Sequence, residues 1–272
     1  MPPRVHPAAG FDAALVERVL ADALAPGVRV YGICGLQGCG KSTLAAQVAA
    51  RARSRGLRVA VVSVDDVYFG RRERQRLARR VHPLLATRGP PGTHDVALGR
   101  ATLDALREGA PVALPRFDKL ADTRLPPSRW HRVDAVDLTL FEGWFLCTPA
   151  QDEAALREPL NAIEREHDAD GRWRHYCNDA LAREYPALWS RIDRLLFLQP
   201  PGFETVPAWR WEQERALQAR RAGPHAMDRA RVARFVQLFE RVSRQALRTL
   251  PDIADLTLRL DAQRRPVDGI PP

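Results

Sequence analysis

The stretch VRVYGICGLQGCGKSTLAA, residues 28–46, decides the fold. Residues 28–34 are rich in β-forming side chains and predict a buried strand, while residues 42–53 carry apolar side chains at helical spacing. Between them stand three glycines within six positions. Glycine is expected at such density where the backbone needs dihedral angles closed to other residues, or where a ligand approaches the main chain. The stretch therefore predicts a strand, a glycine loop and a helix that together serve a ligand.

The loop matches the P-loop motif G-x-x-x-x-G-K-[ST] in the strand-to-helix setting that the motif requires. Such a loop turns backbone N–H groups toward phosphate at the positive end of a helix dipole. We expect ATP or GTP to bind here, with Lys41 reaching the β and γ phosphates and Ser42 ligating Mg²⁺. The residues expected to line the nucleotide site are Gly35, Gln37, Gly38, Cys39, Gly40, Lys41, Ser42 and Thr43.

Cysteine use indicates neither a disulfide framework nor a structural metal, because the four cysteines form no C-x-x-C pair and no cluster with zinc-like spacing. Cys39 is a special case, since it lies within the glycine loop. A helix N-terminus and surrounding N–H groups would lower the pKa of its thiol and raise its reactivity. The alternative is a buried, inert thiol.

Composition suits one α/β domain over residues 1–272, in which residues 28–58 form the ATP loop and its helix. No apolar run approaches the roughly 20 residues of a membrane span, and the N-terminus lacks the apolar core of a signal peptide, so we expect a cytoplasmic protein. The net charge of +9 and the sequence pI of about 10.2 raise nucleic acid as a partner. Arginines are scattered among acids in nearly every expected helix, however, so a preference for arginine over lysine on solvated helix faces is favoured over nucleic-acid binding. An acidic small substrate would also suit this charge.

Apolar segments alternate with helical patterns along the chain, which predicts a doubly wound parallel sheet of the P-loop NTPase type with helices on both faces. Ligands of such sheets gather at the carboxyl ends of the strands. Polar residues follow several expected strands at this edge: Asp65 and Asp66 after 59–64, residues 116–119 after a short strand, and Glu142 near the end of 136–144. The remaining expected strands are 193–200 and 254–261.

The acids suit phosphoryl transfer, which needs a metal ion on the phosphates and a residue that takes the acceptor proton. Glu142 occupies the Walker B position, where it would hold Mg²⁺ directly or through water. Asp65 or Asp66 would act as the base. The alternative, open above all for Asp66, is that these aspartates cap the next helix. Lys41, Asp65 and Glu142 are the expected catalytic residues.

Further blocks of sequence carry a resemblance to a known family. The blocks SVDDVY, RGPPGTHD, LPRFDK, LFEGW and DGRWRHYCNDAL, taken with the P-loop, resemble the plant-type D-glycerate 3-kinase family and its bacterial relatives. That family belongs with the P-loop small-molecule kinases related to phosphoribulokinase, uridine kinase and bacterial pantothenate kinase. The resemblance covers residues 28–260 and implies ATP-dependent phosphorylation of a small hydroxy acid, D-glycerate to 3-phosphoglycerate.

By position, the resemblance implies Asp65 as the base and Glu142 as the acid after the Walker B strand. It implies an acceptor site lined by Asp66, Tyr68, Arg88, Thr93, His94, Asp95, Arg116, Asp118 and Lys119. Arg116 is our first choice for a guanidinium that holds a substrate carboxylate and Arg88 the second; alternatively, Arg116 pairs with Asp118 or another local acid to shape its loop.

Residues 205–225 resemble a basic helical lid, in which Arg215, Arg220 or Arg221 would meet the phosphates; the sequence leaves the choice open.

Two other functions stay open at this point. One is a kinase of the same fold for a nucleoside, sugar or pantothenate-like acceptor. The other is a basic nucleotide-dependent regulator or nucleic-acid binder. The sequence does not determine the oligomeric state or the position phosphorylated.

Overall fold

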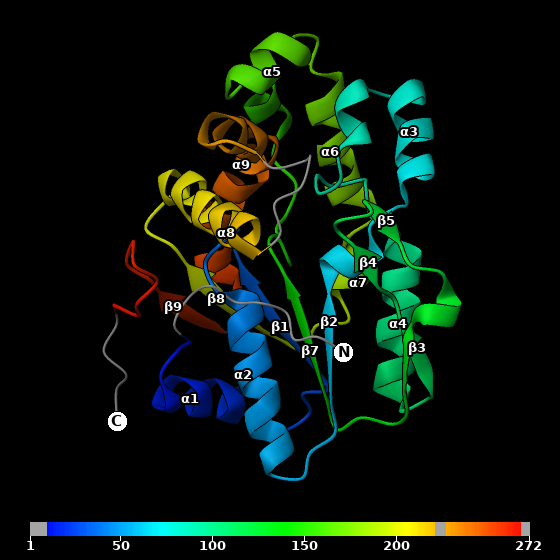
Figure 1. Ribbon diagram of the computed structural model, residues 1–272, viewed down its shortest axis with the longest axis vertical. Coiled ribbons are helices and arrows are strands. Elements are labelled where there is room, and N and C mark those ends of the chain that lie inside the picture. Colours follow the sequence, from blue (N-terminus) through cyan, green and yellow to red (C-terminus); the bar gives the residue numbers. More distant parts are fainter. Residues whose placement is uncertain (1–9, 221–226, 268–272) are drawn as a thin grey trace.

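The computed structural model describes residues 10–220 and 227–267. Over these residues the central sheet has five parallel strands in the order β2-β7-β1-β8-β9 (Figure 1). The strands are β1 (Val30–Gly35), β2 (Val59–Ser63), β7 (Leu138–Gly143), β8 (Arg194–Gln199) and β9 (Leu256–Arg259). The predicted α/β fold with a parallel sheet is confirmed.

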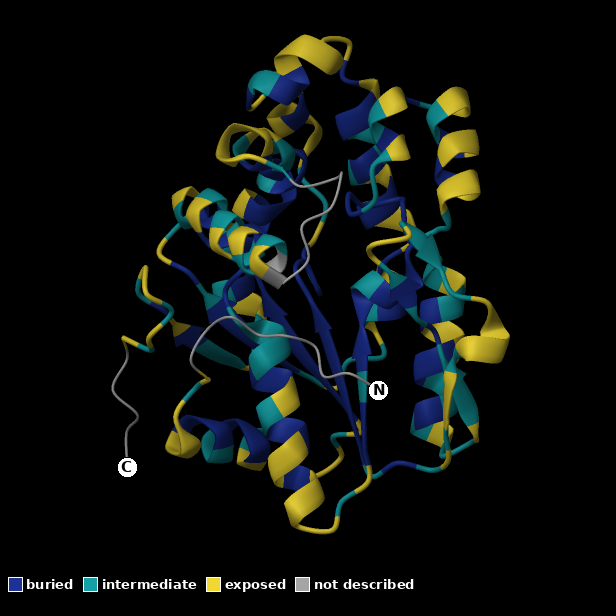
Figure 2. Ribbon diagram, viewed as in Figure 1, coloured by how far each residue is buried: buried dark blue, intermediate teal, exposed yellow. Residues whose placement is uncertain are grey.

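Helices cover both faces of this sheet, because alternate side chains of its strands enter two separate cores. Tyr31 and Ile33 of β1 pack with α1 and α2, whereas Val30 and Cys34 pack into the core on the other face. Figure 2 shows the strands as a buried layer between helices whose outer surfaces are exposed. The helices are α1 (Ala13–Ala23), α2 (Lys41–Ser54), α3 (Arg71–Arg80), α4 (Val96–Glu108), α5 (Ala162–His167), α6 (Arg172–Arg183), α7 (Pro186–Trp189), α8 (Val206–Arg220) and α9 (Arg229–Ile253).

Short 3₁₀ helices connect several of these elements: η1 (Val64–Val67), η2 (Pro83–Ala86), η3 (Pro127–Arg129), η4 (Glu153–Leu156) and η5 (Phe203–Thr205). Of these, η1 directly follows β2 and carries the two aspartates. Its position is fixed by sheet register, since Ser63 at the end of β2 lies opposite Glu142 of β7, and Glu142 lies opposite Ile33 of β1. The carboxyl ends of the three strands therefore bring the P-loop, η1 and Glu142 to one edge.

The segment that contains residues 111–119 differs from expectation. β3 (Val112–Leu114) pairs antiparallel with β6 (His131–Val133), and β4 (Phe117–Asp118) pairs antiparallel with β5 (Thr123–Arg124), both outside the central sheet. The prediction that residues 116–119 follow a strand of the parallel sheet is wrong. Pro111 and Pro115 bound β3 and cannot donate to a ladder, so the strand stays short and half-buried. The β4–β5 hairpin nevertheless packs against η1.

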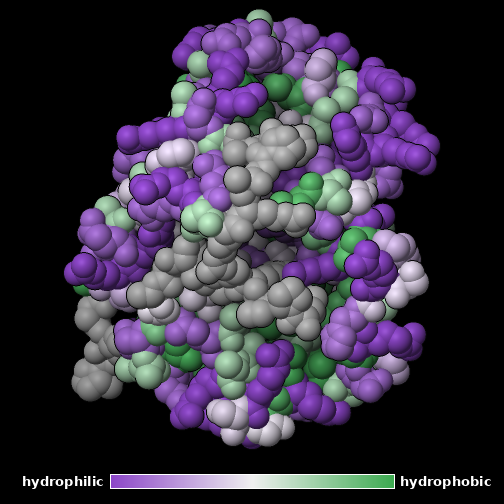
Figure 3. Space-filling model, in the orientation of Figure 1, coloured by the Kyte–Doolittle hydropathy of each residue, from purple (hydrophilic) through white to green (hydrophobic). Residues whose placement is uncertain are grey.

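The face seen in Figure 3 is mostly hydrophilic, with apolar side chains in small, separate areas. Among the described helices none is long and apolar enough to cross a bilayer. The expected lid, residues 205–225, corresponds in part to α8; its residues 221–225 lie outside the described residues.

Candidate active site

The P-loop joins β1 to α2, and two of its glycines have backbone dihedral angles that L side chains rarely adopt. Gly40 caps α2 with φ +100°, and Gly38 has φ +87°. A Cβ on Gly38 would also lie 2.5 Å from Cβ of Trp209 in α8. Glycine is required at both positions, and the close approach at Gly38 fixes α8 against the loop.

A second contact to the loop comes from the far end of the chain. Arg264 donates from Nε to the carbonyl oxygen of Gly38 at 2.6 Å, and its guanidinium lies over the Trp209 ring at 5.0 Å. The Trp209 indole donates to the carbonyl of Ala262 at 2.8 Å. These contacts were not predicted from the sequence, because no local pattern links residues 38, 209 and 264.

Cys39 is fully buried, and its environment differs from the one expected. A Cβ on Gly35 would lie 2.6 Å from its sulfur, so the thiol packs directly against the start of the loop. Burial raises the pKa of Cys39, and the nearby charge of Lys41 lowers it only in part. The prediction of a lowered pKa is wrong, and the structure agrees with the alternative of a buried thiol.

Ser42 and Glu142 come together as the motif predicts. Ser42 donates its hydroxyl to Oε1 of Glu142 at 3.0 Å, and Glu142 is buried. A hydroxyl and a carboxylate oxygen at a helix N-terminus are ligands that fit Mg²⁺. Burial lowers the pKa of neighbouring Lys41, but the charges of Glu142 and Asp65, with the two buried thiols Cys34 and Cys39, raise it above its usual value. Lys41 is therefore held as a cation beside Ser42 and Glu142, the two residues that could bind Mg²⁺.

Asp65 has both carboxylate oxygens engaged. The Tyr68 hydroxyl donates to Oδ1 at 2.6 Å, and Lys119 Nζ lies 2.5 Å from Oδ2. Burial would raise the pKa of Asp65, but the charge and hydrogen bond of Lys119, together with Lys41 and Tyr68, hold it well below its usual range. Asp65 is thus ionised and faces two lysines.

Asp66 points instead toward the β4–β5 hairpin. It accepts a hydrogen bond from the backbone of Phe117 at 3.3 Å, and Arg116 Nη1 lies 3.5 Å from its Oδ2. Asp118 accepts from the backbone N–H groups of Leu120 and Ala121 and closes the turn. Arg116 therefore pairs with Asp66 and not with Asp118.

The hairpin is held by two arginines that meet at Asp122. Arg74, which is buried, donates to the carbonyls of Phe69, Ala86 and Asp122, and its Nη2 lies 2.7 Å from Asp122 Oδ2. Arg88 donates to Asp122 Oδ1 and lies 5.6 Å from the centroid of the Phe117 ring. The backbone that carries residues 116–119 is thus held in place by the contacts of Arg74 and Arg88 with Asp122.

The loop 89–95 is tied into the fold by its polar side chains. Thr93 accepts from the backbone of Gly89 and donates to the carbonyl of Pro90. Asp95 caps α4 and pairs with Arg124 at 3.0 Å.

His94 in the same loop is fully buried, and its Nδ1 lies 2.6 Å from the hydroxyl of Tyr185, while its Nε2 has no hydrogen-bond partner among the described residues. Burial lowers the pKa of His94 to about 3, so its imidazole is neutral at pH 7.

The arginines of α8 and the one that follows it differ in burial. Arg215 is exposed, while the side chain of Arg220 and all of Arg221 lie outside what the structure describes. Arg210, which the sequence analysis did not select, follows Trp209 and is half-buried. Burial lowers its pKa, and the other titratable groups that act on it are Glu214 on its own helix, Arg88, Asp65 and Tyr68. In the described part of the chain no carboxylate lies within 4 Å of its guanidinium, which donates to Gln213 at 2.8 Å.

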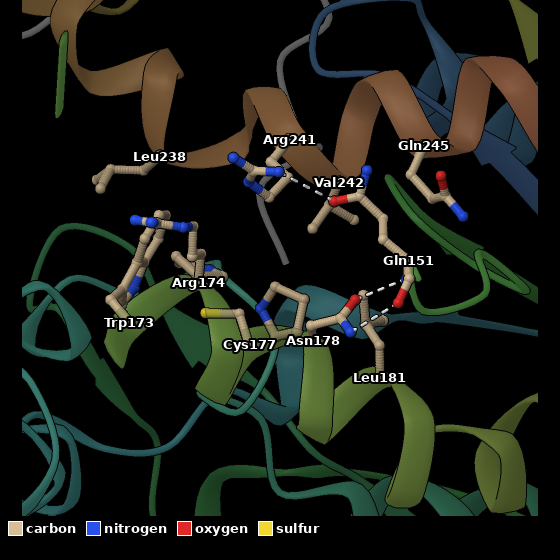
Figure 4. Close-up of a pocket in the computed structure, with 12 residues that line it drawn as sticks. Gln151, Trp173, Arg174, Cys177, Asn178, Leu181, Leu238, Arg241, Val242 and Gln245 are labelled. Carbon is tan, nitrogen blue, oxygen red and sulfur yellow. Dashed lines mark hydrogen bonds between the residues drawn. The ribbon is translucent and has the colours of Figure 1, made fainter. Parts of the chain in front are cut away.

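Two other features of the fold do not belong to this crevice. A cavity of about 20 Å³, room for one water molecule, lies between α6 and α9 behind loop 89–95 (Figure 4). Figure 4 shows side chains of the two helices facing each other across it, and none of the predicted site residues lines it.

His82, Asp168 and Asp170 also approach one another. The Asp168 carboxylate accepts from the backbone of Trp173 and from the backbone and side chain of Arg174, so it is already used by the first turn of α6.

The glycine loop at the carboxyl end of β1, the Ser42–Glu142 pair and the lysine at the helix start define a P-loop nucleotide-binding protein. Comparison with known proteins refines this class. The family model "Methylmalonyl Co-A mutase-associated GTPase MeaB" matches residues 8–68, the segment around the P-loop. The chain is 31% identical over 207 residues to the "Uncharacterized kinase mug58" of Schizosaccharomyces pombe, which covers 70% of this chain and 72% of that protein. This chain therefore belongs to the same family as the kinase mug58.

Two further proteins are similar to this chain. The chloroplastic D-glycerate 3-kinase of Arabidopsis thaliana is 28% identical over 264 residues, which make up 88% of this chain and 54%, about half, of the plant protein. The solved structure of D-glycerate 3-kinase from Cryptococcus neoformans superposes with a TM-score of 0.77 at 23% identity, covering 94% of this chain and 98% of that chain. The second match shows that the fold is shared over nearly the whole length.

Proposed function

We propose that this chain is an ATP-dependent kinase that phosphorylates a hydroxyl of a small hydroxy acid, with D-glycerate as acceptor and 3-phosphoglycerate as product. The observation that supports an acid as the acceptor is a pair of cations beside the two aspartates. Lys119 Nζ lies 2.5 Å from Asp65 Oδ2, and Arg116 Nη1 lies 3.5 Å from Asp66 Oδ2. Positive charge at the acceptor side suits an anionic acceptor. The identity to the plant D-glycerate 3-kinase supports the same acceptor.

In the proposed reaction ATP lies on the P-loop with Lys41 at its β and γ phosphates. Ser42 and Glu142 would hold Mg²⁺, directly or through water, and the ion would neutralise charge on the phosphates. Asp65 takes the proton of the acceptor hydroxyl. Asp66 is the weaker candidate for the base, because its carboxylate contacts Phe117 and Arg116 on the hairpin side, whereas Asp65 feels the charge of Lys41 in the P-loop.

We place Arg210 ahead of Arg215 as the guanidinium that meets the transferring phosphoryl group. Arg210 is half-buried and lies in the field of Asp65, whereas Arg215 is exposed. Arg220 and Arg221 stay predictions. A single kinase domain over residues 1–272 and a cytoplasmic location are also still predictions.

The acceptor residues divide by their contacts. Arg116 and Lys119 would bind the carboxylate, and Arg88 would act mainly through its pair with Asp122. The others form hydrogen bonds that hold the acceptor loops and would position the substrate indirectly: Asp66, Tyr68, Thr93, His94, Asp95 and Asp118.

The proposal is tested by an acceptor screen of the purified chain with ATP and Mg²⁺. D-glycerate, other hydroxy acids, glycerol, sugars, nucleosides and pantothenate are compared by coupled ADP release, and the product is identified by phosphorus NMR. We expect turnover with D-glycerate and a phosphate on its 3-hydroxyl, and none in a folded Lys41→Ala variant. Turnover confined to a nucleoside, sugar or pantothenate would refute the acid acceptor. ATP hydrolysis that needs RNA or DNA and no acceptor would refute the kinase.

A further inference from the structure

The basic residues of this chain are almost all arginine. Of 42 Lys and Arg residues, two are lysines, Lys41 and Lys119, and both lie at the site. Lys41 belongs to the P-loop motif, whereas no part of the glycine-loop motif explains Lys119. An ammonium on a flexible stem exchanges partners readily, whereas the planar guanidinium of arginine holds a carboxylate in a fixed two-point contact. A lysine at this position in such a chain therefore indicates a need for a movable charge.

The surroundings of Lys119 agree with this. Its side chain is 60% exposed, and Asp65 is its partner among the described residues, at 2.5 Å. The backbone beneath it is fixed, since Asp118 closes the turn and Asp122 is held by Arg74 and Arg88. The hairpin thus presents a movable side chain from a fixed backbone.

This ion pair lies on one oxygen of the proposed base. Tyr68 donates to Oδ1 of Asp65, and the Lys119 ammonium lies 2.5 Å from Oδ2. Each oxygen keeps a second lone pair, but a close cation stabilises the charged carboxylate and makes it a weaker proton acceptor. Asp65 therefore becomes a better base when Lys119 leaves Oδ2.

We propose that Lys119 determines acceptor specificity by exchanging partners: its ammonium leaves Asp65 for the carboxylate of the hydroxy acid, and the acceptor hydroxyl takes its place on Oδ2. This inference rests on the proposed function. The hydroxyl proton then passes to Asp65, the hydroxyl oxygen bonds to the γ phosphorus, and the bond from that phosphorus to the β–γ bridging oxygen breaks, so that ADP leaves with the electron pair. A neutral acceptor offers Lys119 no anion and leaves Asp65 covered.

The charged and titratable groups around Asp65 come from four elements. They are Tyr68 directly after η1, Lys41 of α2, Lys119 of the β4–β5 turn and Arg210 of α8, with the neutral imidazole of His94 nearby. Of these groups in the described structure, Lys119 is the one whose side chain is exposed and forms an ion pair with the Asp65 carboxylate. It is therefore the group whose movement changes Asp65 most.

The first test compares D-glycerate with glycerol in the wild type and in Lys119→Met, Lys119→Arg and Arg129→Met. Arg129→Met is the control: Arg129 is exposed on η3, so this change also removes one positive charge but at a position outside the site. Lys119→Met should lower kcat/KM for D-glycerate about 10- to 150-fold, the equivalent of one hydrogen bond to a charged group, and leave kcat/KM for glycerol unchanged or raised. Lys119→Arg should restore the KM for D-glycerate but not kcat, because the guanidinium holds Asp65 more firmly. An equal loss for both acceptors, with Arg129→Met normal, would overturn the inference.

The second test is the pH dependence of kcat/KM for D-glycerate, which reports the free enzyme. Lys119 lowers the pKa of Asp65 and burial raises it. Without the lysine, the base should be protonated at higher pH, so the acidic limb should move to higher pH in Lys119→Met and stay in place in Lys119→Arg. An acidic limb at the same pH in both variants would overturn the exchange.

A third readout does not depend on turnover. Lysine labelled with carbon-13 at Cε gives two signals, which Lys119→Met assigns. D-glycerate should shift the Lys119 signal in the presence of Mg²⁺ and a non-hydrolysable ATP analogue, and glycerol should not. Turnover of D-glycerate without this shift would refute the inference alone, whereas neither turnover nor shift would refute the proposed function as well.

Discussion

Replacing Arg210 by methionine should separate catalysis from stability. Arg210 follows Trp209, which packs on Gly38 of the P-loop, so the start of α8 that carries Arg210 is held against the loop. It is half-buried, donates to Gln213 at 2.8 Å and, in the described part of the chain, has no carboxylate within 4 Å. If our proposal is right, this cation binds the transferring phosphoryl group.

The magnitudes follow from these contacts. One hydrogen bond from a charged group to the transferring phosphoryl group is worth about 1.5–3 kcal/mol, or a 10- to 150-fold loss in kcat for Arg210→Met. On the stability side, the variant loses one hydrogen bond to a neutral amide, worth about 0.5–1.5 kcal/mol, but also removes a charge whose burial is unfavourable. The free energy of unfolding should therefore change by less than about 1 kcal/mol.

The assay measures kcat and KM for both substrates beside the urea unfolding curve, with Arg215→Met as the matched control. Arg215 lies on the same helix and is exposed, so its loss should leave kcat within about twofold. If Arg210→Met loses more than about 2 kcal/mol of stability while kcat is preserved, Arg210 has a structural role and the assignment fails. Equal kcat values in the two variants would refute it as well.

Three further outcomes are expected. Asp65→Asn should lower kcat by about 10²- to 10⁴-fold, the range for a positioned base, whereas Asp66→Asn should mainly lower the midpoint of unfolding; the reverse order would make Asp66 the base. Arg116→Met should raise KM for D-glycerate about 10- to 150-fold and leave KM for ATP nearly unchanged, while an equal loss with glycerol would mean that Arg116 only supports its loop through Asp66. Alkylation of the folded chain should leave activity intact, because burial raises the pKa of Cys39; rapid inactivation that MgATP prevents, and that Cys39→Ser abolishes, would contradict the buried environment.

The parts of the fold that could be predicted depend on local patterns. Continuous apolar runs identified the five parallel strands, and because carboxyl ends of parallel strands share an edge, the meeting of Ser42 and Glu142 followed from the motif alone. The short strand at 112–114 misled this reasoning, since an apolar run of three residues between prolines has the composition of a strand but not the length for the sheet.

The missed contacts depend on residues far apart in the chain. Arg264 and Gly38 are separated by 226 positions, and neither has a sequence pattern that points to the other. Residues distant in the chain also decide the pKa of Cys39, which was expected to be lowered by the backbone N–H groups around it. Its burial comes from side chains of α8 and of the core, which the loop sequence does not contain. Local chemistry predicted the ligands of the site, and tertiary packing decided their electrostatics.

The difference between arginine and lysine connects the two halves of the site. Arg74 and Arg88 meet on Asp122 and fix the acceptor hairpin, a task for which planar guanidinium groups are well suited. Lys119 lies two residues after Phe117, whose backbone is bonded to Asp66, so its Cα is held while its ammonium is free to turn. A fixed arginine in its place would hold Asp65 in the paired state, and a neutral residue would leave the base uncovered before the acceptor arrives. In the proposed exchange, the lysine would couple exposure of the base to the charge of the substrate and so favour an acid acceptor over water and neutral alcohols.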